Sequence, residues 1–190
     1  GIILLVSTSL VAILPVAVVN RLFSEEVRLR LSQLLATQVS RARLYWTNVL
    51  LAVLAGLAGT AAAAVGLGAT AVAAMGDGAS MDFGDFLTAG FNFFPSVLFF
   101  AALAALALGW NPRLGKAVYL YLAYSFALNY FDGLADFPEW LSNTAVQSWI
   151  PRMPAEPFDG TVFAAVTVIS AALMVAGYLG YRRRDMAEGA

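Results

Sequence analysis

Residues 45–72 read YWTNVLLAVLAGLAGTAAAAVGLGATAV, a run without a single Asp, Glu, Lys or Arg. An α-helix needs about 20 mostly apolar residues to cross the hydrocarbon core of a bilayer, so this run predicts a transmembrane helix. The run is also rich in Gly and Ala, which let helix backbones approach each other closely in lipid. We therefore expect tight helix packing along this segment.

Four further stretches have the same character, at residues 2–19, 91–110, 114–131 and 161–181. Lys116 is their only charged residue, and it lies near the start of its stretch, where it can extend to the interface. Of the 190 residues, 61% are hydrophobic and 12% are charged, against about 25% charged in a typical soluble domain. The sequence therefore predicts an all-α fold, a polytopic membrane bundle of five transmembrane helices in a single domain over residues 1–190.

The charge and the missing residue types exclude several function classes. The formal net charge is −1, without the basic excess of a nucleic-acid-binding protein, so we expect no nucleic-acid partner. Cys and His are both absent, which removes thiolate chemistry and the commonest acid–base and metal-binding side chain. No glycine-rich phosphate loop with a Lys is present. We therefore expect no catalytic residue, metal site or bound cofactor in this chain.

The basic residues are placed so that they predict an orientation in the membrane. Ten of the 11 Lys and Arg residues lie in the connection after the first stretch, the connection after the third stretch, and the C-terminal tail. These segments alternate along the chain and so share one side of the membrane. The other two connections carry eight acidic residues and one Arg. Because Lys- and Arg-rich loops stay in the cytoplasm, we expect a multi-pass plasma-membrane protein with a cytoplasmic C-terminus.

The connection at residues 20–43 has the pattern of an amphipathic helix at about 24–38. Ser24 is a favourable N-cap, and Glu25 and Glu26 would lie in the first turn, where the helix dipole favours anions. One face is apolar, formed by Val27, Leu31, Leu34 and Leu35, and the opposite face carries Glu26, Leu29, Arg30, Gln33 and Thr37. An exposed Leu within a charged face suits docking on a partner. The alternative is an interfacial helix that only anchors the bundle.

Two segments of this sequence resemble type-2 ABC exporter permeases. The first is Glu25-Glu26, Arg30 and Leu34-Leu35-Ala36-Thr37-Gln38-Val39-Ser40-Arg41, which is similar to a coupling helix ending in Leu-Leu-Ala-Thr-Pro-Val-Ser-Arg. The second is Ile150-Pro151-Arg152-Met153-Pro154-Ala155-Glu156-Pro157-Phe158 with the tail Arg182-Arg183-Arg184-Asp185. This segment resembles the end of the actinobacterial exporters of polyketide-type antibiotics. Leu29, Ser32 and Gln38 stand where the family commonly has Gly, Glu and Pro.

The resemblance implies a bacterial permease subunit of an ATP-driven exporter that moves a hydrophobic or amphipathic compound outward by alternating access. It implies two ABC ATP-binding partner subunits that hold Mg-ATP, and a second permease half in the same chain or as a separate subunit. It also implies a helix before Gly1, because five stretches are one fewer than a six-helix unit has. The residues expected to contact the ATPase are Glu25, Glu26, Arg28, Leu29, Arg30, Gln33, Thr37 and Arg41.

Several polar and aromatic residues in or near the apolar stretches are candidates for the substrate path: Asn92, Tyr121, Tyr124, Asn129, Trp140 and Trp149. Tyr121 and Tyr124 share a helix face with Leu128, and short helices are expected at 138–141 and 146–150. By the same resemblance, the outer segment at about 132–159 dips into the membrane and caps the path, so that its two Trp side chains would be gate residues. The alternatives are ordinary packing contacts and an interfacial anchor.

Two other function classes stay open. A secondary carrier usually has an ionisable relay inside the membrane, and the apolar stretches have no acidic residue or His from which to build one. A membrane enzyme or lipid-handling scaffold would need a cluster of reactive side chains at one membrane face. Asp132, Asp136 and Glu139 are the only candidates for such a cluster, with no nearby His or Lys to support them.

Overall fold

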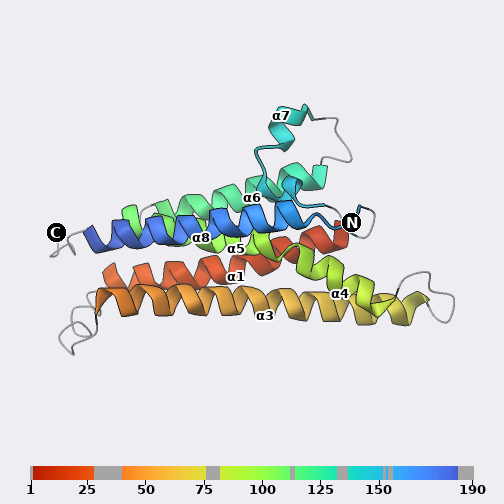
Figure 1. The fold of residues 1–190 in the computed structure, drawn as a ribbon, viewed down its shortest axis with the longest axis horizontal. Helices are drawn as coiled ribbons and strands as arrows, with labels where there is room; N and C mark the ends of the chain where they lie inside the picture. The colour runs from red at the N-terminus through yellow and green to blue at the C-terminus, as the bar shows by residue number, and fades with distance from the viewer. Residues whose placement is uncertain are drawn as a thin grey trace.

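The computed structural model describes residues 2–27, 40–75, 82–111, 114–131, 137–151, 153 and 156–183. In these residues all regular structure is helical, and the long helices run alongside one another (Figure 1). The elements in chain order are α1 (Ile2–Val27), α3 (Arg41–Met75), α4 (Phe83–Asn92), α5 (Phe94–Trp110), α6 (Gly115–Phe131), α7 (Glu139–Ser142), the 3₁₀ helix η3 (Val146–Trp149) and α8 (Gly160–Arg183). The expected helical membrane bundle is confirmed.

Three helical stretches are long and apolar enough to cross a membrane, namely Arg41–Ala74, Phe83–Trp110 and Gly160–Arg183. Within α1, Leu10–Arg21 forms a shorter apolar helix. The 17 residues of α6 would extend about 26 Å at 1.5 Å per residue, slightly less than the core of a bilayer. That α1 and α6 also cross the membrane stays a prediction.

The third apolar stretch begins earlier than the sequence analysis placed it, and it is broken. Asp82 caps α4 by accepting a hydrogen bond from the Phe83 amide at 2.7 Å, and the Asp85 carboxylate accepts one from the Asp82 amide at 2.9 Å. These two acidic residues therefore start a helix instead of lying in an open loop. The helix then breaks at Phe93, because Pro95 has no amide hydrogen and its ring would clash with the preceding turn of a continuous helix.

The first helix also ends later than expected. The backbone of α1 continues through position 24 to Val27, so Ser24 is not the N-cap of a separate helix. No Gly or Pro lies between Pro15 and Val27 to interrupt the helix, and this accounts for its continuation. The predicted coupling helix at 24–38 thus begins within the last turn of α1, and its residues 28–39 lie outside the described part of the chain.

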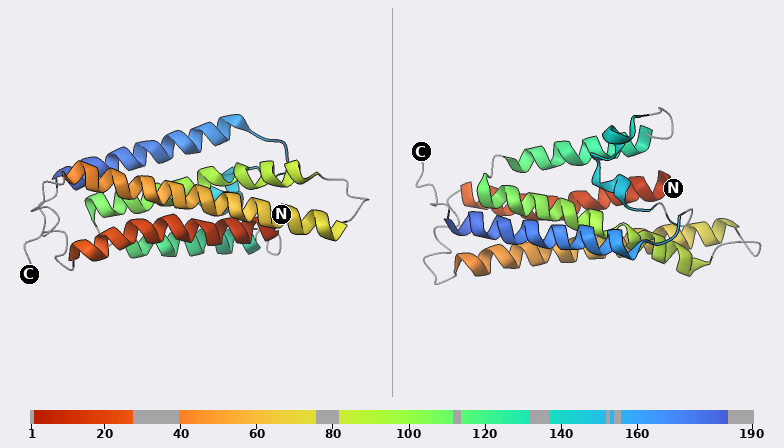
Figure 2. Two further views of the ribbon diagram at one scale, coloured as in Figure 1. Left: turned by 90° about the horizontal axis from the view of Figure 1, so that it is seen from below. Right: turned by 45° about the horizontal axis from the view of Figure 1, so that its top comes forward.

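The centre of the bundle is α5, which packs against α1, α3, α6 and α8 (Figure 2). Most of its 17 residues are buried, and many of them are Ala, Ser or Gly. A helix that is apolar on all sides is typical of a position surrounded by other helices. The helix that the other long helices share is therefore built largely from small side chains.

The contact between α5 and α8 brings the two backbones together. A Cβ atom added to Gly177 would lie 2.6 Å from the Ala105 carbonyl oxygen and 2.5 Å from the Tyr45 hydroxyl. A Cβ atom added to Gly109 would collide with the Gly177 carbonyl group. Close approach of this kind needs glycine on both helices.

The expected tight packing of the Gly- and Ala-rich segment holds for most of its small residues. Cβ atoms added to Gly56, Gly59 and Gly68 would meet side chains of neighbouring helices between 2.9 and 3.1 Å away. Ala64 is buried against Gly90 of α4. Among the glycines of this segment Gly66 is the exception, because its added Cβ would meet no atom within 4 Å, and Ala58, Ala62 and Ala69 are exposed too.

The two ends of the bundle carry opposite charge. The end of α1, the beginnings of α3 and α6, and the end of α8 lie together at the end marked C in Figure 1. The described basic side chains at this end are Arg21, Arg41, Arg43, Lys116, Arg182 and Arg183, and the described acidic side chains of the opposite end are Asp82, Asp85, Glu139, Glu156 and Asp159. The arrangement has the alternation expected from the sequence, and we call the basic end the inner end and the acidic end the outer end.

We expect Gly177→Ala to lower the stability of the bundle by about 1–3 kcal/mol, because the added methyl group must push α5 and α8 apart. The matched control is Gly66→Ala, which adds the same methyl group to open space. Thermal unfolding of the purified protein in detergent measures the difference. Equal unfolding midpoints for the two variants would contradict the close contact between α5 and α8.

Candidate functional site

In the described part of the outer segment between α6 and α8, both short helices expected there are present as α7 and η3. Ser148 Oγ lies within hydrogen-bond distance of the Ser142 carbonyl at 2.6 Å and the Ala145 carbonyl at 2.7 Å. The indole N–H of Trp149 donates to the Asn143 carbonyl at 2.9 Å. These local bonds satisfy carbonyl groups of a short, irregular stretch, and they give residues 142–149 a defined shape.

Thr144 connects this segment to α6. The Tyr121 hydroxyl donates to the Thr144 carbonyl at 2.8 Å, and the Tyr124 hydroxyl lies 2.7 Å from Thr144 Oγ1. Because Thr144 Oγ1 already donates to the Leu141 carbonyl at 2.6 Å, Tyr124 is the donor in its bond to Thr144. We call the contacts of Thr144 with Tyr121 and Tyr124 the tyrosine latch.

Two further contacts hold the outer segment against α4 and α5. The Asn92 side-chain amide donates to the Pro151 carbonyl at 2.7 Å. The Trp149 ring packs against Phe99 with 6.5 Å between centroids. Val146 and Ile150, which belong to the segment, are buried. The segment is therefore fixed to α4, α5 and α6 at the outer end of the bundle.

The structure brings four of the six candidate path residues to this segment, namely Asn92, Tyr121, Tyr124 and Trp149. Of the other two, Trp140 belongs to the segment itself but makes none of these contacts, and Asn129 lies apart from it. Trp140 on α7 is 70% exposed, whereas Asn129 is buried within α6 and its amide donates to the Ser125 carbonyl at 3.0 Å. Contact of any of the six with substrate stays a prediction.

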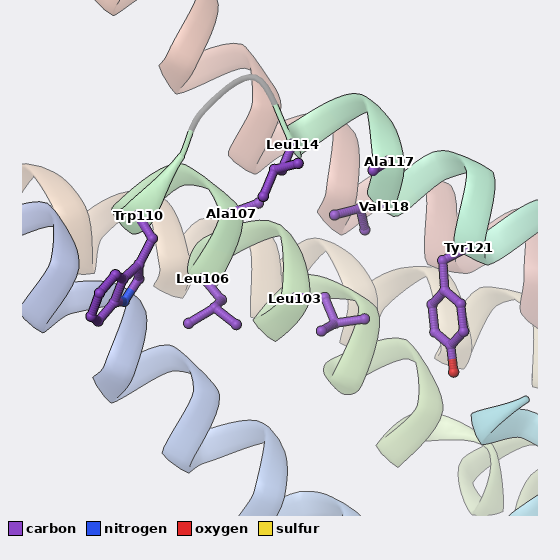
Figure 3. Close-up of a pocket in the computed structure, with 8 residues that line it drawn as sticks. All are labelled: Leu103, Leu106, Ala107, Trp110, Leu114, Ala117, Val118 and Tyr121. Carbon is purple, nitrogen blue, oxygen red and sulfur yellow. The ribbon is translucent and has the colours of Figure 1, made fainter. Parts of the chain in front are cut away.

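An open apolar groove lies between α5 and α6, with a volume of about 460 Å³ (Figure 3). Both helices contribute residues at the spacing i, i+3, i+4 and i+7, which places each set on one helix face. The lining residues are Leu103, Leu106, Ala107 and Trp110 of α5, Leu114 directly before α6, and Ala117, Val118 and Tyr121 of α6. We call this hollow the α5–α6 groove. Of the candidate path residues, only Tyr121 lines it.

The sequence analysis missed an aromatic cluster at the inner end of the bundle. Tyr45 of α3 is fully buried, and its hydroxyl donates to the Met174 carbonyl of α8 at 2.7 Å and lies 3.5 Å from the Ala105 carbonyl of α5. Its ring contacts those of Trp46, Tyr178 and Tyr181, with centroids between 5.4 and 5.7 Å away. The spacing of Tyr178 and Tyr181 on one face of α8 was the available signal, but nothing in the sequence pairs them with Tyr45.

The expected ATPase-contact residues are only partly described. Arg41 is the first residue of α3 and is exposed, directly after Ser40, whose hydroxyl accepts a hydrogen bond from the Arg43 amide at 3.2 Å. Ser40 thus caps α3. Glu25 and Glu26 belong to the last turn of α1, and Arg28, Leu29, Arg30, Gln33 and Thr37 lie outside the described residues.

No group of three or more His, Cys, Asp or Glu side chains within the described ranges is placed to hold a metal ion. The arrangement therefore offers apolar surface, hydrogen bonds to backbone carbonyls and charged ends. These features suit binding and conformational change.

We expect Tyr124→Phe to loosen the outer segment, because it removes one bond of the tyrosine latch and keeps the ring. A neutral hydrogen bond contributes about 1 kcal/mol, so amide hydrogen exchange in residues 142–150 should accelerate roughly fivefold. Tyr130→Phe removes a hydroxyl from the same helix outside the latch and is the control. Equal exchange in the two variants would contradict the latch.

Two comparisons relate the chain to known proteins. Residues 1–182 match the family model described as the multidrug efflux system permease Rv1217c, C-terminal domain. The chain is also 32% identical over 180 residues to the multidrug efflux system permease protein Rv1217c of Mycobacterium tuberculosis, an alignment that covers 92% of this chain and 32% of that protein. The chain thus spans about a third of the length of this relative. Because the family model covers nearly the whole chain, the protein belongs to the family of multidrug efflux permease C-terminal domains.

Proposed function

We propose that this chain is the membrane-spanning part of a permease in an ATP-driven exporter, and that it moves hydrophobic or amphipathic compounds out across the bacterial plasma membrane. The match of residues 1–182 to the efflux permease family is the observation that carries this proposal. The apolar stretches support it, because they contain no acidic residue or His from which an ion-driven carrier could build a relay.

The energy would enter at the inner end. The chain there leads from the end of α1 to the start of α3, and the resemblance to a coupling helix at about 24–38 implies an ATPase contact on that helix. Two ATP-binding subunits that close on Mg-ATP would push on it. Glu26, Leu29 and Arg30 are the proposed contact residues.

The contacts of Tyr45 offer a path for that movement into the bundle. Tyr45 lies in the second turn of α3, soon after the proposed contact segment, and its hydroxyl bonds to the backbone of α8. Displacement of the start of α3 would therefore move α8 and, through the close contact at Gly109 and Gly177, α5 as well. At the outer end the folded segment held by the tyrosine latch would act as the gate.

We expect Glu26→Lys combined with Leu29→Ala to weaken the association of the permease with its ATPase subunits about tenfold or more, since truncation of a hot-spot residue at an interface costs about 2 kcal/mol or more. Glu139→Lys is the matched control, because it makes the same charge change at the outer end. The measurements are ATPase-subunit binding and substrate-stimulated ATP hydrolysis in the complete transporter, reconstituted in liposomes.

If ATPase-subunit binding and substrate-stimulated ATP hydrolysis are unchanged in the double variant, residues 24–38 are not the contact with the ATPase. Export that continues with a hydrolysis-deficient ATPase subunit would refute the ATP-driven mechanism and would favour a secondary carrier.

We expect Glu139→Cys to react with a membrane-impermeant maleimide on intact cells, and Arg183→Cys to react only after the cells are opened. Glu139 and Arg183 are exposed at opposite ends of the bundle, and this chain has no native Cys. The reverse labelling pattern would invert the proposed orientation, in which the C-terminus is cytoplasmic.

A further inference from the structure

The geometry points to the α5–α6 groove as a binding site for uncharged, apolar molecules, with Tyr121 as the residue that relays their binding to the outer segment. This inference rests on the proposed export function and names a ligand class and an entry site for it. The volume of the α5–α6 groove, about 460 Å³, lies within the range of roughly 300–1,000 Å³ that is usual for small-molecule pockets.

The lining of the groove determines the ligand class. Among the described residues that line the groove, the only polar side-chain atoms are the indole nitrogen of Trp110 and the hydroxyl of Tyr121. Both are already used, since Trp110 donates to the Ala176 carbonyl and Tyr121 to the Thr144 carbonyl, each at 2.8 Å. A charged or strongly polar ligand would lose its hydration here and find no free side-chain donor in this lining, whereas an apolar ligand needs none.

The dimensions of the groove favour a compact molecule over a helix or a lipid tail. Leu103 and Trp110 mark its two ends on α5, about 10 Å apart at 1.5 Å per residue. A spanning helix needs about 30 Å, and a lipid tail about half of that. Trp110 stands at one end and Tyr121 at the other, and Ala107 and Ala117 lie between them (Figure 3). The aromatic ends and the small middle leave room for a short ligand.

Tyr121 links the groove to the gate because one side chain serves both. Its ring lines the groove and packs against Phe100 and Tyr124, with centroids 5.7 and 6.3 Å away. Its hydroxyl is half of the tyrosine latch. A ligand that displaces the ring from the groove must therefore strain or break the bond to Thr144. Tyr121 is thus a positioning residue for the outer segment as well as a wall of the binding site.

The binding test uses the full-length permease in lipid nanodiscs and Nile red, an uncharged fluorescent probe. We expect saturable binding to the unaltered protein and at least tenfold weaker binding to Ala117→Trp, whose new side chain fills the groove. Ala123→Trp is the matched control on an exposed position of the same helix outside the groove. Equal binding of Nile red by the two variants would overturn the site. So would competition in which ethidium, a fixed cation, displaces Nile red as well as an uncharged compound does.

A second measurement keeps the test valid if Ala117→Trp fails to fold. Brominated lipid tails quench the fluorescence of Trp side chains that they touch. In nanodiscs of such lipids, the difference in fluorescence between the unaltered protein and Trp110→Phe gives the emission of Trp110 and so reports its quenching. We expect Nile red to relieve this quenching by displacing lipid from the groove. Quenching that Nile red leaves unchanged would show that lipid tails occupy the groove. An absence of both quenching and Nile red binding would show that another helix covers it, and either result overturns the proposal.

The relay is tested at Asn143, which is exposed beside Thr144. In Asn143→Cys, Nile red should raise the rate of maleimide labelling severalfold, whereas in Asn143→Cys with Tyr121→Phe the rate should be high without the probe and unresponsive to it. A response that survives Tyr121→Phe would exclude the relay.

Export assays with the same proteins separate this inference from the proposed function. Equal export of Nile red by Ala117→Trp and Ala123→Trp would refute the groove and leave the exporter intact. If the unaltered transporter exports no apolar compound, the exporter assignment fails whatever the groove binds.

Discussion

The close contact of α5 with α8 is the constraint on which the rest of the bundle depends. In lipid, burial of apolar side chains gives helices little reason to associate, so packing at short range must supply the attraction. Gly109 and Gly177 supply it here, because no side chain separates the two backbones at these positions. A methyl group added at this contact would force α5 and α8 apart and would also move α3. The reason is that the Tyr45 hydroxyl reaches the carbonyls of Ala105 and Met174 across the same interface. Three helices are thus held in one arrangement by two glycines and one hydroxyl group.

The other side of α5 is built differently. The α5–α6 groove lies between the exposed edges of these two helices, and α6 packs more closely against α1 than against α5. Near the inner end the Asn20 side chain of α1 donates to the Gly115 carbonyl at 3.3 Å, and in the middle of α6 Tyr121 and Tyr124 bond to Thr144. Because α6 contacts α5 much less extensively than α8 does, movement of α6 and the outer segment relative to α5 should cost less than movement of α8.

The sequence predicted the parts of this structure that depend on local pattern. Long apolar runs marked the helices, the alternation of basic and acidic connections matched the two ends, and the spacing of Tyr121 and Tyr124 placed them on a common face. It misplaced the start of α4, where Asp82 and Asp85 resembled loop residues but form a capping box, although Pro95 was a readable signal for the break that follows. The partners Thr144, Met174 and Pro151 could not be predicted, because each lies far along the chain from the side chain that bonds to it.

The distribution of polar contacts explains how such a bundle could transmit movement without an ion relay. Within the helices, hydroxyl groups mostly bond to their own backbone, as Thr60 does to Gly56 and Ser170 to Val166. Several side chains that bond between elements lie instead toward the helix ends, as Tyr45 does near the start of α3, Trp110 at the end of α5 and Asn92 at the end of α4. The exceptions are Tyr121 and Tyr124, which bond to Thr144 from the middle of α6. Between the ends, contact relies on small residues, which slide or separate without breaking a buried hydrogen bond. A push at the inner end would therefore meet firm connections first and a deformable middle second, and it would reach the outer segment through the few bonds that hold it.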